Sequence, residues 1–151
     1  MAADRTYVAE NDFERERLRA LVGRLTDEDL RLPLPGGWTV AAVLAHAGFW
    51  DARAIVFYEA WLKGSRPPAA AYEPDDTDWV NDAFKPVCLA LAPREAARVS
   101  LRLAEEADSV VAALSDELLA RILAAGSPPL NLSRATHRRE HLDDIEQVLG
   151  G

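Results

Sequence analysis

The sequence has a single cysteine, few aromatic residues and few of the β-branched or aromatic runs that are typical of strands. Cys88 is alone in a chain of 151 residues, so it cannot form an intrachain disulfide. Aromatic residues make up 7% of the chain, which with the scarcity of strand-like runs favours helices. The first residues, MAADRTYVAEN, lack the basic and then apolar pattern of a signal peptide. We therefore expect a protein of the reducing cytoplasm.

Positive charge and long apolar runs are also scarce. The chain has 17 lysines and arginines against 25 aspartates and glutamates, and its net charge is −8. The arginine cluster of Arg134, Arg138 and Arg139 is interleaved with acidic residues, whereas a nucleic-acid site needs a continuous basic surface. The longest apolar run, PVCLALAP, is too short to span a bilayer. We expect a small-molecule partner and neither a nucleic acid nor a membrane.

What the sequence does contain is helical periodicity. Hydrophobic residues make up 49% of the chain, enough for one core, so we expect a single domain over residues 1–151. Thr39 suits the N-cap of a long helix that Gly64 ends, and Pro93 suits the first turn of another. Apolar residues recur at helical spacing in four segments. These segments are residues 4–24, 39–64, 93–114 and 131–149.

Four amphipathic helices predict an all-α four-helix bundle. The connection over residues 65–92 is unusually long, and TDWVNDAF (residues 77–84) within it reads as a short helix. A connection of this length can cross the whole bundle, so the second and third long helices can run parallel instead of forming a hairpin. A second short helix is expected after Ser115. The pattern leaves both topologies open.

Two of the three histidines lie four residues apart in the last predicted helix. Successive residues of a helix turn by about 100°, so a sector roughly 80° wide holds His137, His141, Ile145 and Val148. The same geometry puts Arg138 and Glu140 on the flanks and Arg139 on the opposite side. We therefore expect both histidines to face the interior. A lone buried histidine is most often a hydrogen-bonded core residue, but a pair at this spacing also suits one metal ion.

His46 supplies the third imidazole, because its position on the helix over residues 39–64 is close to the inward apolar stripe. Imidazoles at i and i+4 reach one ion at about 2.0–2.1 Å. Three neutral nitrogens suit Zn²⁺, Ni²⁺, Fe²⁺ or Co²⁺ better than Mg²⁺ or Ca²⁺. Three protein ligands leave an open position, as in catalytic metal sites. The residues predict a metal held by His46, His137 and His141.

Three segments carry a resemblance to a known family. They are GWTVAAVLAHAGFWDA (residues 37–52), DWVNDAF (residues 78–84) and HRREHLDDIEQVL (residues 137–149). In this order they resemble the DinB/YfiT-like superfamily of small four-helix metal proteins. The resemblance covers its Trp-Ser/Thr-Val helix start with an inward histidine, its asparagine-bearing crossover and its His-x-x-x-His closing helix.

The resemblance implies a divalent metal on the three histidines, zinc or nickel foremost, a bundle with a long crossover, and often a homodimer. Relatives include S-transferases that use mycothiol, bacillithiol or glutathione, mycothiol-dependent maleylpyruvate isomerases, and proteins that hydrolyse or sequester a toxic metabolite. The isomerases have a carboxylate among their metal ligands and a further C-terminal domain. This chain has a histidine at each matched position, so we do not expect the isomerase reaction.

Three functions follow as hypotheses. The first is a metal-dependent transferase that directs a low-molecular-weight thiol at an electrophilic small molecule. The second is a hydrolase that uses metal-bound hydroxide, and the third is a non-catalytic protein that binds a metal or sequesters a small molecule.

Other polar and aromatic residues are candidates around this site. Glu140 or Asp144 would orient an imidazole or carry a proton, although a solvated or salt-bridged role is the simpler reading. Trp50, Trp79 and Asn81 would contact substrate, while the alternatives are core packing for Trp50 and packing of the crossover for Trp79. Cys88 lies in an apolar run, so we expect a buried and inert thiol and not a nucleophile.

Overall fold

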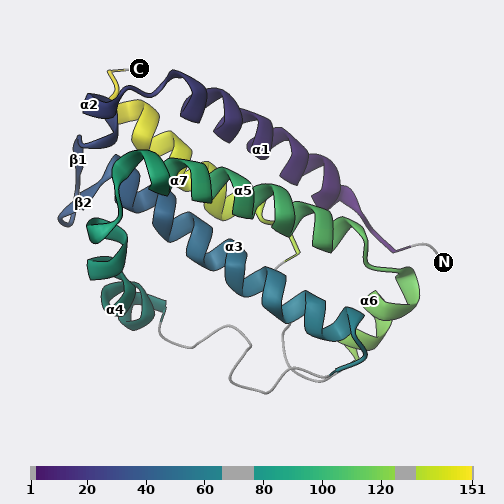
Figure 1. The fold of residues 1–151 in the computed structure, drawn as a ribbon. Helices are drawn as coiled ribbons and strands as arrows, with labels where there is room; N and C mark the ends of the chain where they lie inside the picture. Colours follow the sequence, from purple (N-terminus) through teal and green to yellow (C-terminus); the bar gives the residue numbers. More distant parts are fainter. Residues whose placement is uncertain (1–2, 66–76, 125–131, 151) are drawn as a thin grey trace.

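The computed structural model describes residues 3–65, 77–124 and 132–150, and these are almost entirely helical (Figure 1). The fold is all-α, as the periodicity predicts. In chain order the elements are α1 (Thr6–Arg24), α2 (Asp27–Leu30), β1 (Pro33–Leu34), β2 (Trp38–Thr39), α3 (Val40–Leu62), α4 (Thr77–Ala90), α5 (Pro93–Ala112), α6 (Asp116–Leu123) and α7 (Ala135–Val148).

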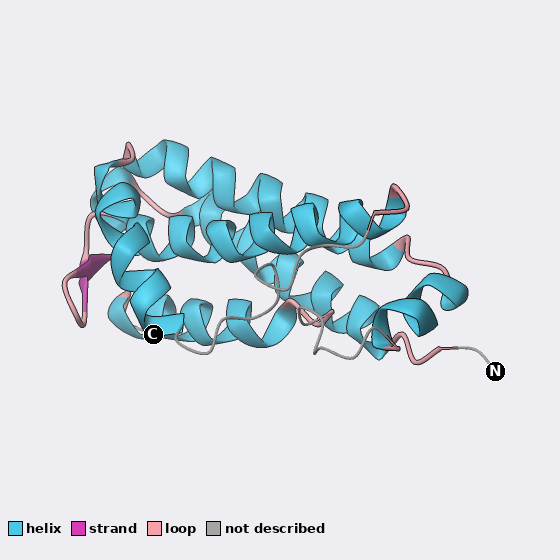
Figure 2. Cartoon of the chain, turned by 90° about the horizontal axis from the view of Figure 1, so that it is seen from below, coloured by secondary structure: helices cyan, strands magenta, loops and turns pink. Residues whose placement is uncertain are grey.

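The long helices α1, α3, α5 and α7 form the bundle, and α3 and α5 run in the same direction (Figure 1). α1 is antiparallel to α5, because Arg94 at the start of α5 donates to the carbonyl of Leu25 after the end of α1, at 2.9 Å. At the other end the Tyr7 hydroxyl donates to the carbonyl of Val111, at 3.2 Å. The link between α3 and α5 is therefore a crossover. Figure 2 shows the long helices side by side, with the β1–β2 ribbon at one end.

The crossover contains a longer helix than the sequence pattern indicates. The expected short helix covers residues 77–84, whereas α4 extends from Thr77 to Ala90 and includes Pro86. Phe84 on α4 stacks on Phe49 of α3, with ring centroids 4.3 Å apart. This contact holds α4 against the bundle near the middle of α3.

The helix α3 lies at the centre of the bundle. Thr39 is its N-cap, as predicted, because its Oγ1 accepts a hydrogen bond from the N–H of Ala42 at 3.1 Å. By length and composition α3 is long and apolar enough to cross a membrane, but most of it is buried inside the bundle. That burial is the property of a core helix in a soluble protein.

Close packing between α3 and α5 depends on small residues. A Cβ built on Gly48 would lie 3.4 Å from the Cα of Ser100 and 3.3 Å from Cδ1 of Leu103, so a larger residue there would need the neighbours to shift. The side chains of α5 that are buried among the helices include Ala97, Ser100 and Ala104. The two parallel helices therefore approach closely beside the turn of α3 that contains His46.

The core is divided into two hydrophobic clusters with a polar layer between them. Along α3 one cluster ends at Ala45 and the other begins at Ala54. His46 and Asp51 lie between these positions, and both are buried. The interruption of the apolar core marks the level of the bundle at which the candidate site is built.

Candidate metal centre

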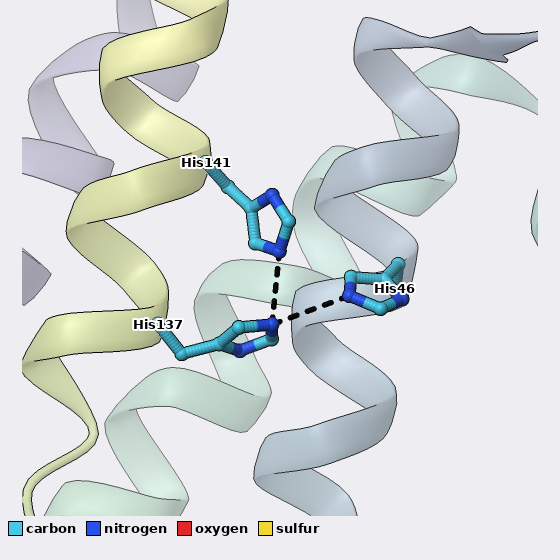
Figure 3. Close-up of side chains that lie close together, drawn as sticks. All are labelled: His46, His137 and His141. Atoms are coloured by element: carbon cyan, nitrogen blue, oxygen red, sulfur yellow. Dashed lines mark hydrogen bonds between the residues drawn. The ribbon is translucent and has the colours of Figure 1, made fainter. Parts of the chain in front are cut away.

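His46 of α3 and the pair His137 and His141 of α7 converge in the space between the two helices (Figure 3). The Nε2 atom of His137 lies 3.2 Å from Nε2 of His46 and 2.9 Å from Nε2 of His141. One ligand atom from each residue lies within 4.8 Å of the other two. The structure thus brings together the three histidines that the sequence selects.

These distances fit a shared metal ion better than a set of hydrogen bonds. A ring nitrogen carries either one N–H or one lone pair, so Nε2 of His137 can satisfy only one of its two neighbours by hydrogen bonding. Two nitrogens bound to one ion at about 2.0–2.1 Å would themselves lie roughly 2.9–3.4 Å apart. The two measured separations fall in this range, and the three-nitrogen donor set suits a divalent transition metal.

The surroundings keep the imidazoles neutral, which is the form that binds metals. Burial lowers the pKa of His46 to about 4, and the neighbouring His141 adds to this effect. Burial lowers the pKa of His137 to about 3, with further contributions from His141 and His46. Burial also lowers the pKa of His141, while the negative charges of Asp144 and Glu140 oppose it. All three rings are therefore free of the second proton at neutral pH.

The orientation of α7 differs from the one that its sequence predicts. Arg138 is expected on a flank, but its exposed fraction is 3%, and it occupies the buried line of α7 with Leu142 and Ile145. His137 and His141 are half-buried at the edge of that line. The prediction fails because it treats arginine as a surface residue, whereas carboxylates on two other helices compensate the buried charge here.

Those carboxylates belong to Asp51 of α3 and Asp108 of α5. Arg138 donates to both oxygens of Asp108, at 3.0 and 3.1 Å, and lies 3.3 Å from Oδ2 of Asp51. Arg134 donates from Nε to Oδ1 of Asp51 at 2.9 Å, and Arg15 of α1 contacts Asp108 at 2.9 Å. We call this group of Arg15, Asp51, Asp108, Arg134 and Arg138 the ionic layer. It connects all four long helices beside the histidines.

The start of α7 is held by Asn11 of α1. The buried Asn11 side chain accepts hydrogen bonds from the backbone N–H groups of Arg134 and Ala135, at 2.7 and 3.1 Å. Its amide nitrogen donates to the carbonyl of Leu132 at 3.1 Å. Asn11 therefore supplies from another helix the cap that α7 lacks within its own sequence, since Arg134 makes no side-chain cap.

Two cavities adjoin the three histidines, and His46 and His141 line both. The smaller one, about 400 Å³, is lined by residues with polar side chains apart from Trp50, among them Arg134, Thr136, His137 and Glu140. The larger one, about 720 Å³, has an apolar wall of Leu34, Trp38, Val43 and Val148. Asp78, Asp82 and Asp144 also line the larger cavity. His46 and His141 thus lie at two cavities that differ in their other lining residues.

The predicted substrate-contacting residues are separated by the structure. Asn81 lines both cavities, and Trp50 lines the smaller one while its indole N–H donates to Oδ1 of Asn81 at 2.9 Å. Trp79 lines neither of these cavities in the described part of the chain, and 71% of its side chain is exposed. The structure therefore does not place Trp79 at the pocket mouth. Both predicted helpers lie at the site, Glu140 at the smaller cavity and Asp144 at the larger one.

Sequence reasoning overlooked Trp38 and the arginines of α7. Trp38 packs edge-on against His46, with ring centroids 5.4 Å apart, and Lys85 lies over the Trp38 ring. Trp38 directly precedes Thr39, the N-cap of the helix that contains His46. This position could have indicated that Trp38 lies near the histidines. Arg134 and Arg138 gave no such signal, because their partners come from helices distant in sequence.

The comparison with protein families matches the DinB superfamily over residues 10–141, a range that includes all three histidines and reaches from α1 into α7. The comparison with curated proteins found no match, and the comparison with solved structures found none either. The matched range covers most of the chain, and the helical fold agrees with the match. The chain therefore belongs to the DinB superfamily.

Proposed function

We propose that this protein transfers a low-molecular-weight thiol to an electrophilic small molecule. The observation that carries the proposal is that two cavities with different lining residues share His46 and His141. A transfer needs two organic substrates to reach one reaction centre, whereas hydrolysis needs one organic substrate and water. The two cavities provide a separate place for each substrate.

The three histidines would hold a divalent transition metal, zinc or nickel, as both the donor set and the neutral rings favour. Such an ion, when bound, lowers the pKa of a thiol so that the nucleophilic thiolate forms at neutral pH. In the transfer, sulfur forms a bond to the electrophilic carbon, the leaving group departs with its bonding electrons, and the thiol proton passes to solvent.

The smaller cavity suits the polar part of the thiol. Mycothiol, bacillithiol and glutathione all carry many hydrogen-bonding groups. The lining offers the hydroxyl of Thr136 and the amide of Asn81 to such groups. The indole of Trp50 also lines this cavity. The contacts would orient the thiol with its sulfur toward the histidines.

The larger cavity suits an electrophile with an apolar body. Leu34, Trp38, Val43 and Val148 give it an apolar wall, and burial of an apolar group there is favourable by about 25 cal/mol per Å². Its volume of about 720 Å³ allows a bicyclic or extended compound. An electrophile in this cavity meets the histidines at His46 and His141.

Asn81 has a defined role at the junction of the cavities. An indole N–H can only donate, so the Asn81 atom that lies 2.9 Å from it must be the carboxamide oxygen. That assignment leaves the amide N–H₂ group as the donor that Asn81 offers to ligands. A donor at the reaction centre stabilises negative charge that develops on the electrophile or its leaving group.

A hydrolase is the second candidate, and Glu140 is the observation in its favour. Glu140 lines the smaller cavity together with His137 and His141, so a carboxylate is present that can accept a proton from water. In this case water takes the place of the thiol, and the smaller cavity holds a hydrolysable substrate. Asp144 lines the other cavity and has no such position beside His137.

The experiment that tests the proposal begins with metal content after gentle purification. The metal-loaded protein is then mixed with a chlorobimane dye and mycothiol, bacillithiol or glutathione in turn, and fluorescence reports transfer above the uncatalysed rate. We expect turnover with at least one thiol, loss of both metal and turnover in His137→Ala, and retention of both in the matched control Trp79→Ala, which alters a residue outside the two cavities.

Three results would contradict the transferase. A protein that binds neither Zn²⁺ nor Ni²⁺ at micromolar concentration excludes each metal-dependent version. A metal-loaded protein with no turnover of any thiol, but with hydrolysis of ester or amide substrates that Glu140→Gln abolishes, would establish the second candidate instead. Metal binding without either reaction would support the third hypothesis, a non-catalytic protein that binds a metal or sequesters a small molecule.

A further inference from the structure

Arg138 is buried at the level of the bundle where the histidines of α7 meet His46 of α3. We infer that Arg138, through Asp108 and Asp51, is a positioning residue that sets the rotation of α7 and so directs His137 and His141 toward His46. The inference rests on the metal site of the proposed function and is independent of the thiol reaction.

The contacts of Arg138 restrict the rotation of α7. Its two terminal nitrogens bind the two oxygens of Asp108 at 3.0 and 3.1 Å, which is the planar fork that a guanidinium forms with a carboxylate. The same nitrogens contact Asp51 on α3 and the backbone carbonyl of Asn11 on α1, each at 3.3 Å. Arg138 is therefore directed at three helices at once.

Rotation matters because Arg138 directly follows His137. Neighbouring residues on a helix project about 100° apart, so an inward Arg138 places His137 and His141 at the edge of the buried line. That edge is where the two cavities lie. A rotation of α7 that moved His137 into the core would turn both rings away from His46 and would leave buried Asp108 without its fork.

The ionic layer also limits sliding of α7 along α3. Asp51 lies five residues after His46, about 7.5 Å along the helix axis. It pairs with both Arg134 and Arg138, which precede and follow His137 in the sequence. A shift of either helix along its axis would break these pairs before it separated the apolar contacts around them.

Stability alone is a weak explanation for this arrangement. A buried ion pair is often no more stabilising than apolar side chains of similar volume, because the charges lose their hydration. Apolar residues at positions 108 and 138 would continue the hydrophobic clusters that flank the layer. They would not, however, select one rotation of α7, since apolar contacts have little directional preference.

The test separates the position of the histidines from stability. In the double variant Arg138→Met with Asp108→Val, the exchange removes one charge of each sign. Arg134 keeps its pair with Asp51, and Arg15, which loses Asp108, keeps its pair with Asp12. The matched control is Arg139→Met, which changes the next residue of α7. Arg139 pairs with Glu14, and in this variant Glu14 still has its contact with Arg17 at 3.3 Å. Each protein is unfolded in urea without metal, and each is titrated with Zn²⁺ and with Co²⁺, whose visible spectrum reports the ligand geometry.

We expect the double variant to unfold at a similar or higher urea concentration than the unmodified protein, yet to bind Zn²⁺ about 10- to 100-fold more weakly and to give an altered Co²⁺ spectrum. Arg139→Met should match the unmodified protein in both readouts. An unchanged affinity and spectrum in the folded double variant would overturn the inference, as would an equal loss in Arg139→Met.

Two further outcomes are decided by the same measurements. If the double variant does not fold, Arg138→Lys takes its place, because lysine keeps the charge but cannot form the two-pronged contact. Metal affinity unchanged in Arg138→Lys would overturn the inference. If the unmodified protein binds no metal, the proposed function fails as well, which distinguishes that result from a failure of the positioning role alone.

Discussion

Trp50 and Asn81 are joined by a hydrogen bond of 2.9 Å that links the core helix α3 to the crossover helix α4 at the point where the two cavities meet. The bond fixes which end of the Asn81 amide is left for a ligand. Because the Trp50 indole N–H can only donate, the remaining group is a donor.

Replacement of Asn81 by aspartate tests that role. The carboxylate still accepts from Trp50, but it offers no N–H and places negative charge where charge develops. We expect kcat for thiol transfer to fall about 10- to 100-fold, with the metal affinity unchanged. Stopped-flow kinetics and Zn²⁺ titration measure the two quantities. A comparable loss of metal affinity would show that Asn81 instead supports the histidines.

The charge of the larger cavity predicts a preference among electrophiles. Asp78, Asp82 and Asp144 line it, and its described lining contains no lysine or arginine. A cationic electrophile should therefore bind better than a neutral one of the same shape, most clearly at low ionic strength. A neutral bromobimane and its trimethylammonio analogue form a suitable pair.

In the variant Asp78→Asn with Asp82→Asn we expect the ratio of kcat/KM for the cationic over the neutral compound to fall about 3- to 10-fold. Glu106→Gln with Glu117→Gln removes two exposed acidic charges outside both cavities and is the control for net charge. If both proteins change the ratio equally, the preference arises from the net charge of the protein. In that case the cavity does not select by charge.

Cys88 is the basis of a prediction about pH. The thiol is 1% exposed, and burial raises its pKa from 9.0 to about 11. The unfolded chain therefore loses this proton at a lower pH than the folded protein does. The resulting stabilisation is complete below about pH 9 and is lost as the pH rises toward 11, by roughly 2–3 kcal/mol.

The free energy of unfolding should accordingly fall more steeply between pH 9 and 11 in the unmodified protein than in Cys88→Ala, whose baseline stability is lower. At pH 8 iodoacetamide should modify the native thiol slowly and the urea-unfolded thiol rapidly. Parallel slopes in the two proteins would contradict the raised pKa. Rapid native modification would contradict the burial of the thiol.

Asn11 is expected to contribute more to stability than an ordinary buried asparagine. Asn11→Ala removes the acceptor for two N–H groups at the start of α7 and the donor to Leu132, so we expect the free energy of unfolding to drop by about 2–4 kcal/mol. Asn11→Asp retains the acceptor and should lose less. Urea denaturation without metal measures both, and an equal loss in the two variants would exclude the capping role.

The sequence was most informative where the signal is local. Thr39 as an N-cap and the apolar stripe of α3 depend on neighbours within a few residues, and both are found as expected. The convergence of His46 with His137 and His141 was also predictable, because each faces the bundle from a long, regular helix. The direction of the crossover was left open, since length alone permits two topologies.

Arg138 shows why the remainder could not be predicted. Its burial depends on Asp51, 87 residues away in the chain, and on Asp108, 30 residues away. No periodicity relates these positions, so a pattern of polar and apolar residues places the guanidinium in solvent. The detailed orientation of the site is therefore a tertiary property, although its candidate ligands are visible in the sequence.

The crossover has a consequence for how this scaffold can be altered. All residues of α4 are described, and of these only Cys88 is buried, yet the helix contributes Asn81, Asp78 and Asp82 to the cavity walls. The three candidate metal ligands and the bulk of the core belong to other helices. Libraries confined to the face of α4 should thus retune ligand preference at little risk to folding, which makes this segment the natural starting point for laboratory evolution of new specificities.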